Sequence, residues 1–278
     1  DQNVENAVIK LAADDKGHYI NFNDFGDASH TEAKEEGSRT AVTSVTVEGG
    51  TAGTKLVLDN ISADTITAAG GADVKVKTTG SNNFVITTGA GADVINMMSD
   101  DVRANDITDD PTDANSVDNT DEGDAVNAGA GNDRLIINGS DNLGNYAGVG
   151  QLTDDDVFMK IKSVENLEIQ GGGTNKVILD EAAATSNTNL QNIYITGAGA
   201  QTTTVQIGNN FTNEKGTLTI DSTKDLSGDF GAAAKSGALT LNIESQDTDQ
   251  DVDLVNLNVI VGMNQGADVN FDNTGDSK

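Results

Sequence analysis

The sequence predicts an all-β protein, most simply a parallel β-helix or β-solenoid with little helix. Three observations support this fold class. Hydrophobic residues alternate in short runs, a strand–turn–strand frame recurs along the chain, and the 278 residues include one proline and no cysteine. A period of two is typical of strands. Repeats that cannot bury an apolar face alone build a continuous core by stacking. Two β-sandwich domains are the alternative architecture.

The strands are expected where Val, Leu, Ile or Thr alternate and the run ends in Gly, Asn or Asp. These runs lie at 42–47, 56–58, 193–195, 217–220, 238–243 and 255–261. Short helical turns are expected only at 32–37, 154–160 and 180–184, where a polar loop is the equal alternative. We expect residues 41–278 to form the repeat domain and residues 1–40 to form an N-terminal segment. The apolar stretch 3–11 of that segment is a candidate assembly contact.

Internal repeats favour the stacked architecture. The segment 164–171 recurs 26 residues later as 190–197, and each copy leads through a turn of small residues into another strand, at 177–179 and 205–207. The same frame occurs at 42–49, with the strand 56–58 behind it. The sequence therefore predicts equivalent positions in successive repeats.

The charge balance restricts the partners. Asp and Glu total 45 against 16 Lys and Arg, which gives a formal net charge of −29. Such a surface repels nucleic acid and anionic membrane, because both require neutralisation by Lys and Arg. No apolar stretch approaches the ~20 residues of a membrane span. A high density of carboxylates can instead be neutralised by calcium, which takes about six to eight oxygen ligands. We therefore expect no nucleic-acid partner and no membrane insertion, and we expect calcium as the cofactor.

Two nonapeptides concentrate this chemistry. Residues 88–96 and 128–136 each match the calcium-binding pattern G-G-x-G-x-D-x-U-x, where U is a large apolar residue, except at the first glycine. Glycine permits a positive φ, which turns carbonyl oxygens inward, and Asp supplies the negative charge. The expected ligand positions in the two copies are Gly89, Gly91, Asp93, Gly129, Gly131 and Asp133. The alternative is a set of plain tight turns with solvated Asp side chains.

The same spacing extends to weaker copies. Asp124 lies nine residues before Asp133, and Asp64 lies nine residues before Asp73, so these three additional Asp residues are candidate ligands. Between the two good nonapeptides lies an acidic insertion at 99–123, which begins with Asp100 and Asp101. Calcium would order such a segment by screening its carboxylates. Asp100 and Asp101 are therefore candidate ligands of a second class of site.

The stretch 88–173 resembles the RTX-bearing C-terminal region of proteobacterial S-layer proteins, of the Caulobacter type. In that family, nonapeptide repeats lead into a β-solenoid rung of the form D…F…hydrophobic-E-x-L-x-V, which residues 156–169 match here. The resemblance implies calcium-triggered self-assembly, a parallel β-helical body and type I secretion through an uncleaved C-terminal signal. It places the chain outside the cell or on the bacterial surface. Because the nonapeptides are not in tandem, we expect isolated turns instead of a long calcium-loaded roll.

The residues favour one of three functions. A structural subunit of a calcium-dependent layer, sheath or filament is the leading expectation, with other copies of the chain and cell-surface polysaccharide as partners. A calcium-stabilised module of a large RTX adhesin or biofilm matrix protein is the alternative. An enzyme on a β-helix is not expected, because His18 and His30 are the only imidazoles and arginine is nearly absent.

Overall fold

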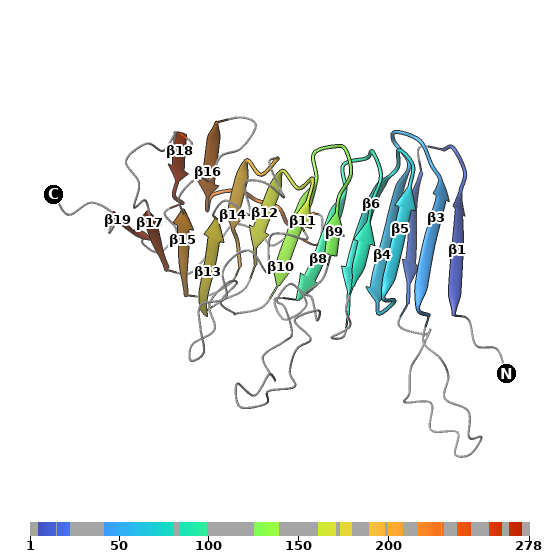
Figure 1. Cartoon of the computed structure of the whole chain (residues 1–278), viewed down its shortest axis with the longest axis horizontal. Coiled ribbons are helices and arrows are strands. Elements are labelled where there is room, and N and C mark those ends of the chain that lie inside the picture. Colours follow the sequence, from blue (N-terminus) through green and yellow to red (C-terminus); the bar gives the residue numbers. More distant parts are fainter. Residues whose placement is uncertain are drawn as a thin grey trace, which may run out of the picture.

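The computed structural model describes an all-β chain in the residue ranges 5–14, 16–22, 42–79, 84–98, 125–138, 161–170, 173–179, 189–197, 200–207, 216–228, 230, 238–245, 256–262 and 267–273. No helix occurs among these residues, and every strand pairing is parallel. Figure 1 shows the strands ranked along the long axis, from β1 near the N-terminus to β19 near the C-terminus. Parallel pairing contradicts the sandwich alternative, because β-sandwiches are built from antiparallel sheets.

The strands form three sheets. Sheet A contains β1 (Asn6–Leu11), β3 (Ser44–Gly49), β5 (Thr65–Ala69), β7 (Val85–Thr87), β9 (Ala125–Asn127) and β11 (Ile161–Lys162). Sheet B contains β2 (Gly17–Asn21), β4 (Lys55–Ile61), β6 (Asp73–Thr78), β8 (Val94–Met98), β10 (Arg134–Asn138), β12 (Asn166–Ile169), β14 (Asn192–Ile195), β16 (Thr217–Asp221) and β18 (Asn256–Ile260). Sheet C contains β13 (Gly173–Leu179), β15 (Gln201–Ile207), β17 (Leu239–Ser245) and β19 (Ala267–Asn273).

The chain alternates between sheets throughout. Up to β12 it moves between sheets A and B, and from β12 onward it moves between sheets B and C. Each strand up to β17 therefore pairs with the strand two positions further along the chain, except β11, at which sheet A ends. Each of the six runs expected to be strands overlaps a strand, and the repeat at 164–171 pairs in register with its copy at 190–197, Leu167 with Ile193 and Ile169 with Ile195. The following strands also pair as expected, Val177 with Val205.

The described residues of the N-terminal segment, 5–14 and 16–22, contribute strands to the same sheets as the rest of the chain. β1 pairs with β3, and β2 pairs with β4. His18, which we expected outside the repeats, lies on β2. The expected helical turns at 32–37, 154–160 and 180–184 lie outside the described residues.

A single apolar column runs through all nine strands of sheet B, and we call it the core column. Its members pair in register from strand to strand. They are Ile20, Leu58, Val76, Ile95, Leu135, Leu167, Ile193, Ile220 and Val259. The seven inner members are each at most 1% exposed, whereas the two end members are only half-buried. Each strand therefore covers the core of its neighbour.

The middle of sheet B is covered on its outer face as well. In β8, β10 and β12 most side chains of both faces are buried, whereas β4 and β6 alternate between buried and partly exposed positions. The connection after β16 reaches this face, because the Phe230 carbonyl accepts hydrogen bonds from Gln170 Nε2 at 2.6 Å and from Asn96 Nδ2 at 3.4 Å. The connection after β16 thus packs across β8 and the end of β12, which are distant from it in sequence.

Candidate metal centre

Three turns that lead from sheet A into sheet B carry the glycine- and Asp-rich segments. They precede or begin β6, β8 and β10, and they contain residues 70–73, 88–93 and 128–133. The Ala90 amide donates to the Gly70 carbonyl at 2.7 Å, and the Ala130 amide donates to the Gly89 carbonyl at 2.8 Å. The turns therefore stack directly on one another. The expectation of isolated turns was wrong, because β8 and β10 pair in register although the acidic insertion separates them in sequence.

Glycine is required here mainly because the stacked backbones approach closely. A Cβ atom on Gly129 would lie 1.9 Å from the Gly89 carbonyl oxygen, and a Cβ atom on Gly131 would lie 1.9 Å from the Gly91 carbonyl oxygen. The expected positive φ occurs at Gly129, with φ +82°, and not at Gly89, Gly91 or Gly131. The sequence pattern thus predicted the glycine positions, but the physical reason differs at three of the four.

Acidic side chains from four successive strands of sheet B form a hydrogen-bonded series that we call the carboxylate column. It consists of Asp73, Asp93, Asp133 and Glu165. Asp93 Oδ1 accepts from the Val74 amide at 2.7 Å, and Asp133 Oδ1 accepts from the Asp93 amide at 2.8 Å. Glu165 Oε2 accepts from the Asp133 amide at 2.7 Å. Each carboxylate therefore ties its own turn to the preceding one.

Asp73 closes the column at its other end. Its Oδ1 accepts from the Ala92 amide at 3.0 Å, so the turns at 70–73 and 88–93 are joined by carboxylates in both directions. At Asp93 and Asp133, which are buried, these contacts contradict the interpretation of plain tight turns with solvated Asp side chains. The carboxylates act as acceptors for backbone amides that the strand ladder leaves unpaired.

The two central carboxylates are buried and only half satisfied. Asp93 and Asp133 are both 0% exposed. Within the described part of the chain, the Oδ2 atom of each has no hydrogen-bond partner. Hydrogen bonding by the Thr88 hydroxyl and the Gly89 amide lowers the pKa of Asp93, and the Thr88 hydroxyl also donates to the Ala128 carbonyl at 2.9 Å. A buried carboxylate oxygen without a partner is costly, and a proton, an ordered water or a cation would satisfy these two atoms.

Burial and mutual repulsion raise the pKa values of both groups. Burial raises the pKa of Asp133 to about 7, and the charges of Asp93, Glu165 and Asp73 act in the same direction. Burial also raises the pKa of Asp93, and the charge of Asp73 contributes to the rise. Hydrogen bonds from backbone amides oppose these effects. Negative charge on these carboxylates is therefore unfavourable, and a bound cation would reduce the repulsion between them.

Glu165 was not expected to be a site residue. It stands immediately before β12, as Asp93 stands before β8 and Asp133 before β10. Its Oε1 accepts from Asn189 Nδ2 at 2.9 Å, so both of its oxygens have partners. A search for an acid immediately before each strand of sheet B would have found it, whereas the nonapeptide pattern excludes it because its turn lacks glycine.

The other predicted ligands do not join this column. Asp64 is exposed at the turn into β5, at the opposite edge of the sheets, and its carbonyl accepts from the Val85 amide at 2.7 Å. Nine residues correspond to half of a repeat. Two positions nine residues apart therefore lie in turns at opposite edges of the sheets. In the next repeat, the position equivalent to Asp64 is occupied by the buried Phe84. Asp124, Asp100, Asp101 and the acidic insertion 99–123 lie outside the described residues.

The column meets a calcium ion's requirements in charge and in ligand type. Asp93 and Asp133 present hard oxygen atoms that are buried and free of hydrogen bonds. Because calcium takes about six to eight oxygens, carbonyl or water oxygens would have to complete its shell. Among the described residues, no group of three or more His, Asp or Glu side chains converges on one point. The candidate centre is therefore a pair of adjacent carboxylates, flanked by Asp73 and Glu165.

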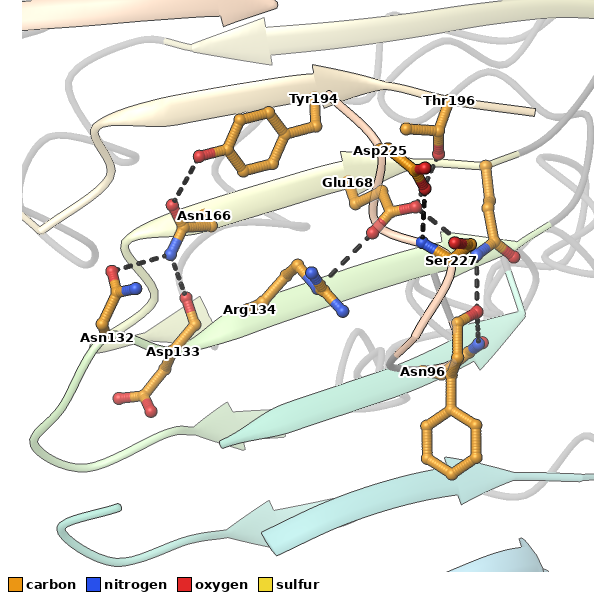
Figure 2. A network of polar contacts seen from close by, with 12 residues as sticks. Asn96, Asn132, Asp133, Arg134, Asn166, Glu168, Tyr194, Thr196, Asp225 and Ser227 are labelled. Carbon is orange, nitrogen blue, oxygen red and sulfur yellow. Dashed lines mark hydrogen bonds and ion pairs between the residues drawn. The ribbon is translucent and has the colours of Figure 1, made fainter. Parts of the chain in front are cut away.

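A second polar network lies beside the column on the outer face of sheet B (Figure 2). Asn166 Nδ2 donates to Asn132 Oδ1 at 3.1 Å and to the Asp133 carbonyl at 2.9 Å, and Asn192 Nδ2 donates to Asn166 Oδ1 at 2.8 Å. Asn side chains thus bond from strand to strand. The hydrogen bonds to Asn132 and to Asp133 connect this network to the last glycine-rich turn.

Arg134 and Glu168 form the centre of this network. Arg134 Nε lies 3.4 Å from Glu168 Oε2, and Glu168 is fully buried. The Thr196 hydroxyl donates to Glu168 Oε1 at 2.5 Å. Figure 2 shows these residues on neighbouring strands beneath the connection that contains Asp225 and Ser227. The charge of Glu168 is thus compensated within the protein, unlike the charges of Asp93 and Asp133.

No protein-family model, curated protein or solved structure matches this chain. The described residues contain no helix that is long and apolar enough to cross a membrane. The resemblance to RTX-bearing S-layer proteins therefore rests on the residues quoted for it.

Proposed function

We propose that this chain is a structural subunit of an extracellular, calcium-dependent layer, sheath or filament, built on a β-solenoid that winds between the sheets. The observation that carries the proposal is the pair of buried Oδ2 atoms of Asp93 and Asp133, which have no partner among the described residues. Other copies of the chain are the principal partner, and cell-surface polysaccharide is a further one. No catalytic role is proposed.

Calcium fits the electrostatics better than the alternatives for these two carboxylates. Protonation would satisfy one of them, but the pKa of about 7 for Asp133 leaves it largely ionised in a mildly alkaline medium. No basic side chain belongs to the column. A bound calcium ion would supply the missing positive charge between adjacent turns. Asp93 and Asp133 would hold it, and the stacked turns would keep the two carboxylates at a fixed spacing.

The net charge of −29 supports the proposed structural role. Copies of such a chain repel one another until cations neutralise them. Calcium that ties the turns therefore also permits association. This double requirement makes assembly depend on calcium in a cooperative way, which suits a protein that stays soluble until it meets an extracellular calcium concentration.

A calcium-stabilised module of a large RTX adhesin is the second candidate. The half-buried apolar residues of the end strands favour it, because further repeats of a longer chain would cover them equally well. The two candidates differ in self-association. A module gains thermal stability in calcium and remains monomeric, whereas a subunit polymerises.

The test is assembly in calcium. We expect the purified chain to scatter light and to form ordered polymers in electron micrographs on addition of millimolar calcium, and to dissociate in chelator. The double variant Asp93→Asn/Asp133→Asn should need a higher calcium concentration, and the variant Asp64→Asn, at the exposed turn, should assemble like the wild type. A wild-type chain that stays monomeric at every calcium concentration contradicts the structural role.

A further inference from the structure

Among the described residues, sheet B ends in two edge strands that retain the features of its interior. Its outermost strands are β2 and β18, and every neighbouring pair between them is parallel. The core column reaches both edges, at Ile20 and Val259, where it is half-buried instead of fully buried. Leu257 on β18 is half-buried in the same way. Both edges therefore present apolar positions in the register of the core.

The outer faces of the same two strands are also apolar in part. Tyr19 on β2 is 61% exposed, and Ile260 on β18 is 45% exposed. The other sheets show the same feature at their ends, where Val8 on β1 is 55% exposed and Phe271 on β19 is 68% exposed. Four of the six large hydrophobic side chains that are exposed among the described residues thus lie on the end strands.

Neither edge of sheet B carries the charges that usually protect an edge strand. Soluble proteins block edges with Lys, Pro, bulges or inward-pointing charges. β2 reads GHYIN and β18 reads NLNVI, so neither contains an acid, a Lys, an Arg or a Pro. The chain has 45 acidic residues, but neither of these two strands contains one. A second copy that pairs with either strand therefore meets no acidic side chain of that strand.

We infer that β18 of one copy pairs in parallel with β2 of the next, so that sheet B continues from copy to copy as a head-to-tail filament. A copy displaced along the sheet axis brings its Ile20 beside Val259, which extends the core column without interruption. Because the two edges are different surfaces, each copy has one donor edge and one acceptor edge, and the contact generates an open filament. This inference rests on the self-assembly proposed above and names the surfaces that carry it.

Charge favours this contact over contact through the sides. Residues 5–22 of the sequence contain Glu5, Asp14 and Asp15 against Lys10 and Lys16, so the first repeat has a formal charge of only −1, with His18 uncharged. β18 has no charged side chain. Association at these edges therefore buries apolar surface with little of the repulsion expected elsewhere on a chain of −29.

The test uses two variants that block opposite edges. Ile20→Lys places a charge on the β2 edge, and Val259→Lys places one on the β18 edge. In calcium, we expect each variant alone to sediment as a monomer, while the wild type sediments as polymers. A mixture of the two variants should give one-to-one dimers and nothing larger, because only one intact donor edge meets one intact acceptor edge.

Val85→Lys is the matched control. Val85 is 48% exposed on β7, which has neighbours on both sides in sheet A, so this variant should polymerise like the wild type. Should either edge variant lose its circular dichroism spectrum, Tyr19→Lys and Ile260→Lys replace them, since both side chains are already exposed.

Three outcomes overturn the inference. Edge variants that polymerise like the wild type show that copies join through their sides. Edge variants that dimerise alone show that like edges pair. A wild-type chain that remains monomeric in calcium removes the proposed self-assembly as well, so failure of the contact and failure of the function are distinguishable.

Discussion

Gly129 and Gly131 lie where the backbone of one turn passes directly beside the carbonyl oxygens of the preceding turn. The glycines of the nonapeptide pattern are therefore needed to avoid steric clashes between stacked turns as much as to place ligands. Gly131 illustrates the difference, because it has no positive φ and yet leaves no space for a methyl group. The stacking of the turns therefore depends on glycine even where the backbone conformation does not.

Replacement of Gly131 by Ala should destabilise the fold. The new Cβ atom would lie 1.9 Å from the Gly91 carbonyl oxygen, so one of the stacked backbones must move. We expect a loss of about 1–3 kcal/mol in the free energy of unfolding, as for overpacked cores. Urea denaturation measures it. Gly228→Ala is the control, because no heavy atom lies within 4 Å of its added methyl group. Equal stability of the two variants would refute the steric role.

The carboxylates of the same turns give the protein an unusual pH dependence when calcium is absent. The pKa of Asp133 rises from 3.8 to about 7 on folding, so the folded chain binds more protons than the unfolded chain between these values. The free energy of unfolding therefore falls as pH rises from about 4 to about 7. This rise in pKa corresponds to at most about 4 kcal/mol. The pKa of Asp93 is raised as well, and acts in the same direction.

Denaturant unfolding in chelator at several pH values measures this slope. Asp133→Asn should flatten it, because the titrating group is removed, whereas Asp64→Asn at the exposed turn should leave it unchanged. A free energy of unfolding that rises with pH in this window, or the same slope in wild type and Asp133→Asn, would contradict the raised pKa values.

The elements of sheet B differ in how much of each strand is buried. β8, β10 and β12 are covered on both faces, and the outer cover depends on backbone contacts such as those of the Phe230 carbonyl. Beneath it, the ion pair of Arg134 and Glu168 holds one charge of each sign on neighbouring strands. Sheet B is therefore continuous. Partly buried and exposed side chains alternate in the strands at its ends, whereas both faces are buried in its middle.

Arg134→Met should cost about 3–5 kcal/mol in the free energy of unfolding, because it removes the guanidinium that lies beside the buried Glu168 carboxylate. The double variant Arg134→Met/Glu168→Gln should recover much of this loss, since Gln keeps an acceptor for the Thr196 hydroxyl without the charge. Thermal or urea unfolding distinguishes the variants. A double variant no more stable than Arg134→Met would show that the charge of Glu168 is not the cause.

At the scale of the whole molecule, the sequence predicts the parallel stacking better than the number of sheets. The repeat frames at 164–171 and 190–197 pair in the expected register, because the alternation of Leu167 and Ile169 fixes which side chains face the core. The frame at 42–49 looks the same but lies in sheet A, whereas the other two lie in sheet B. Alternation defines a strand and its inward face, and it contains no information on which sheet receives the strand.

The candidate site was predictable to a similar extent. Asp93 and Asp133 were found from their glycines, and the structure brings them together with Asp73. Glu165 was missed because its turn has no glycine, and Asp64 was misplaced because a nine-residue period spans only half of a repeat. The cover over sheet B was also missed, since it depends on backbone carbonyls that any residue supplies.

Calcium binding by the carboxylate column is the central claim, and equilibrium dialysis with radioactive calcium tests it most directly. Wild type and Asp64→Asn should share a class of saturable sites with a dissociation constant of about 10⁻⁴–10⁻³ M, as in extracellular calcium-binding modules. Asp93→Asn/Asp133→Asn should lose that class while it retains its circular dichroism spectrum. Equal calcium stoichiometry and affinity in the folded double variant and the wild type would contradict the claim.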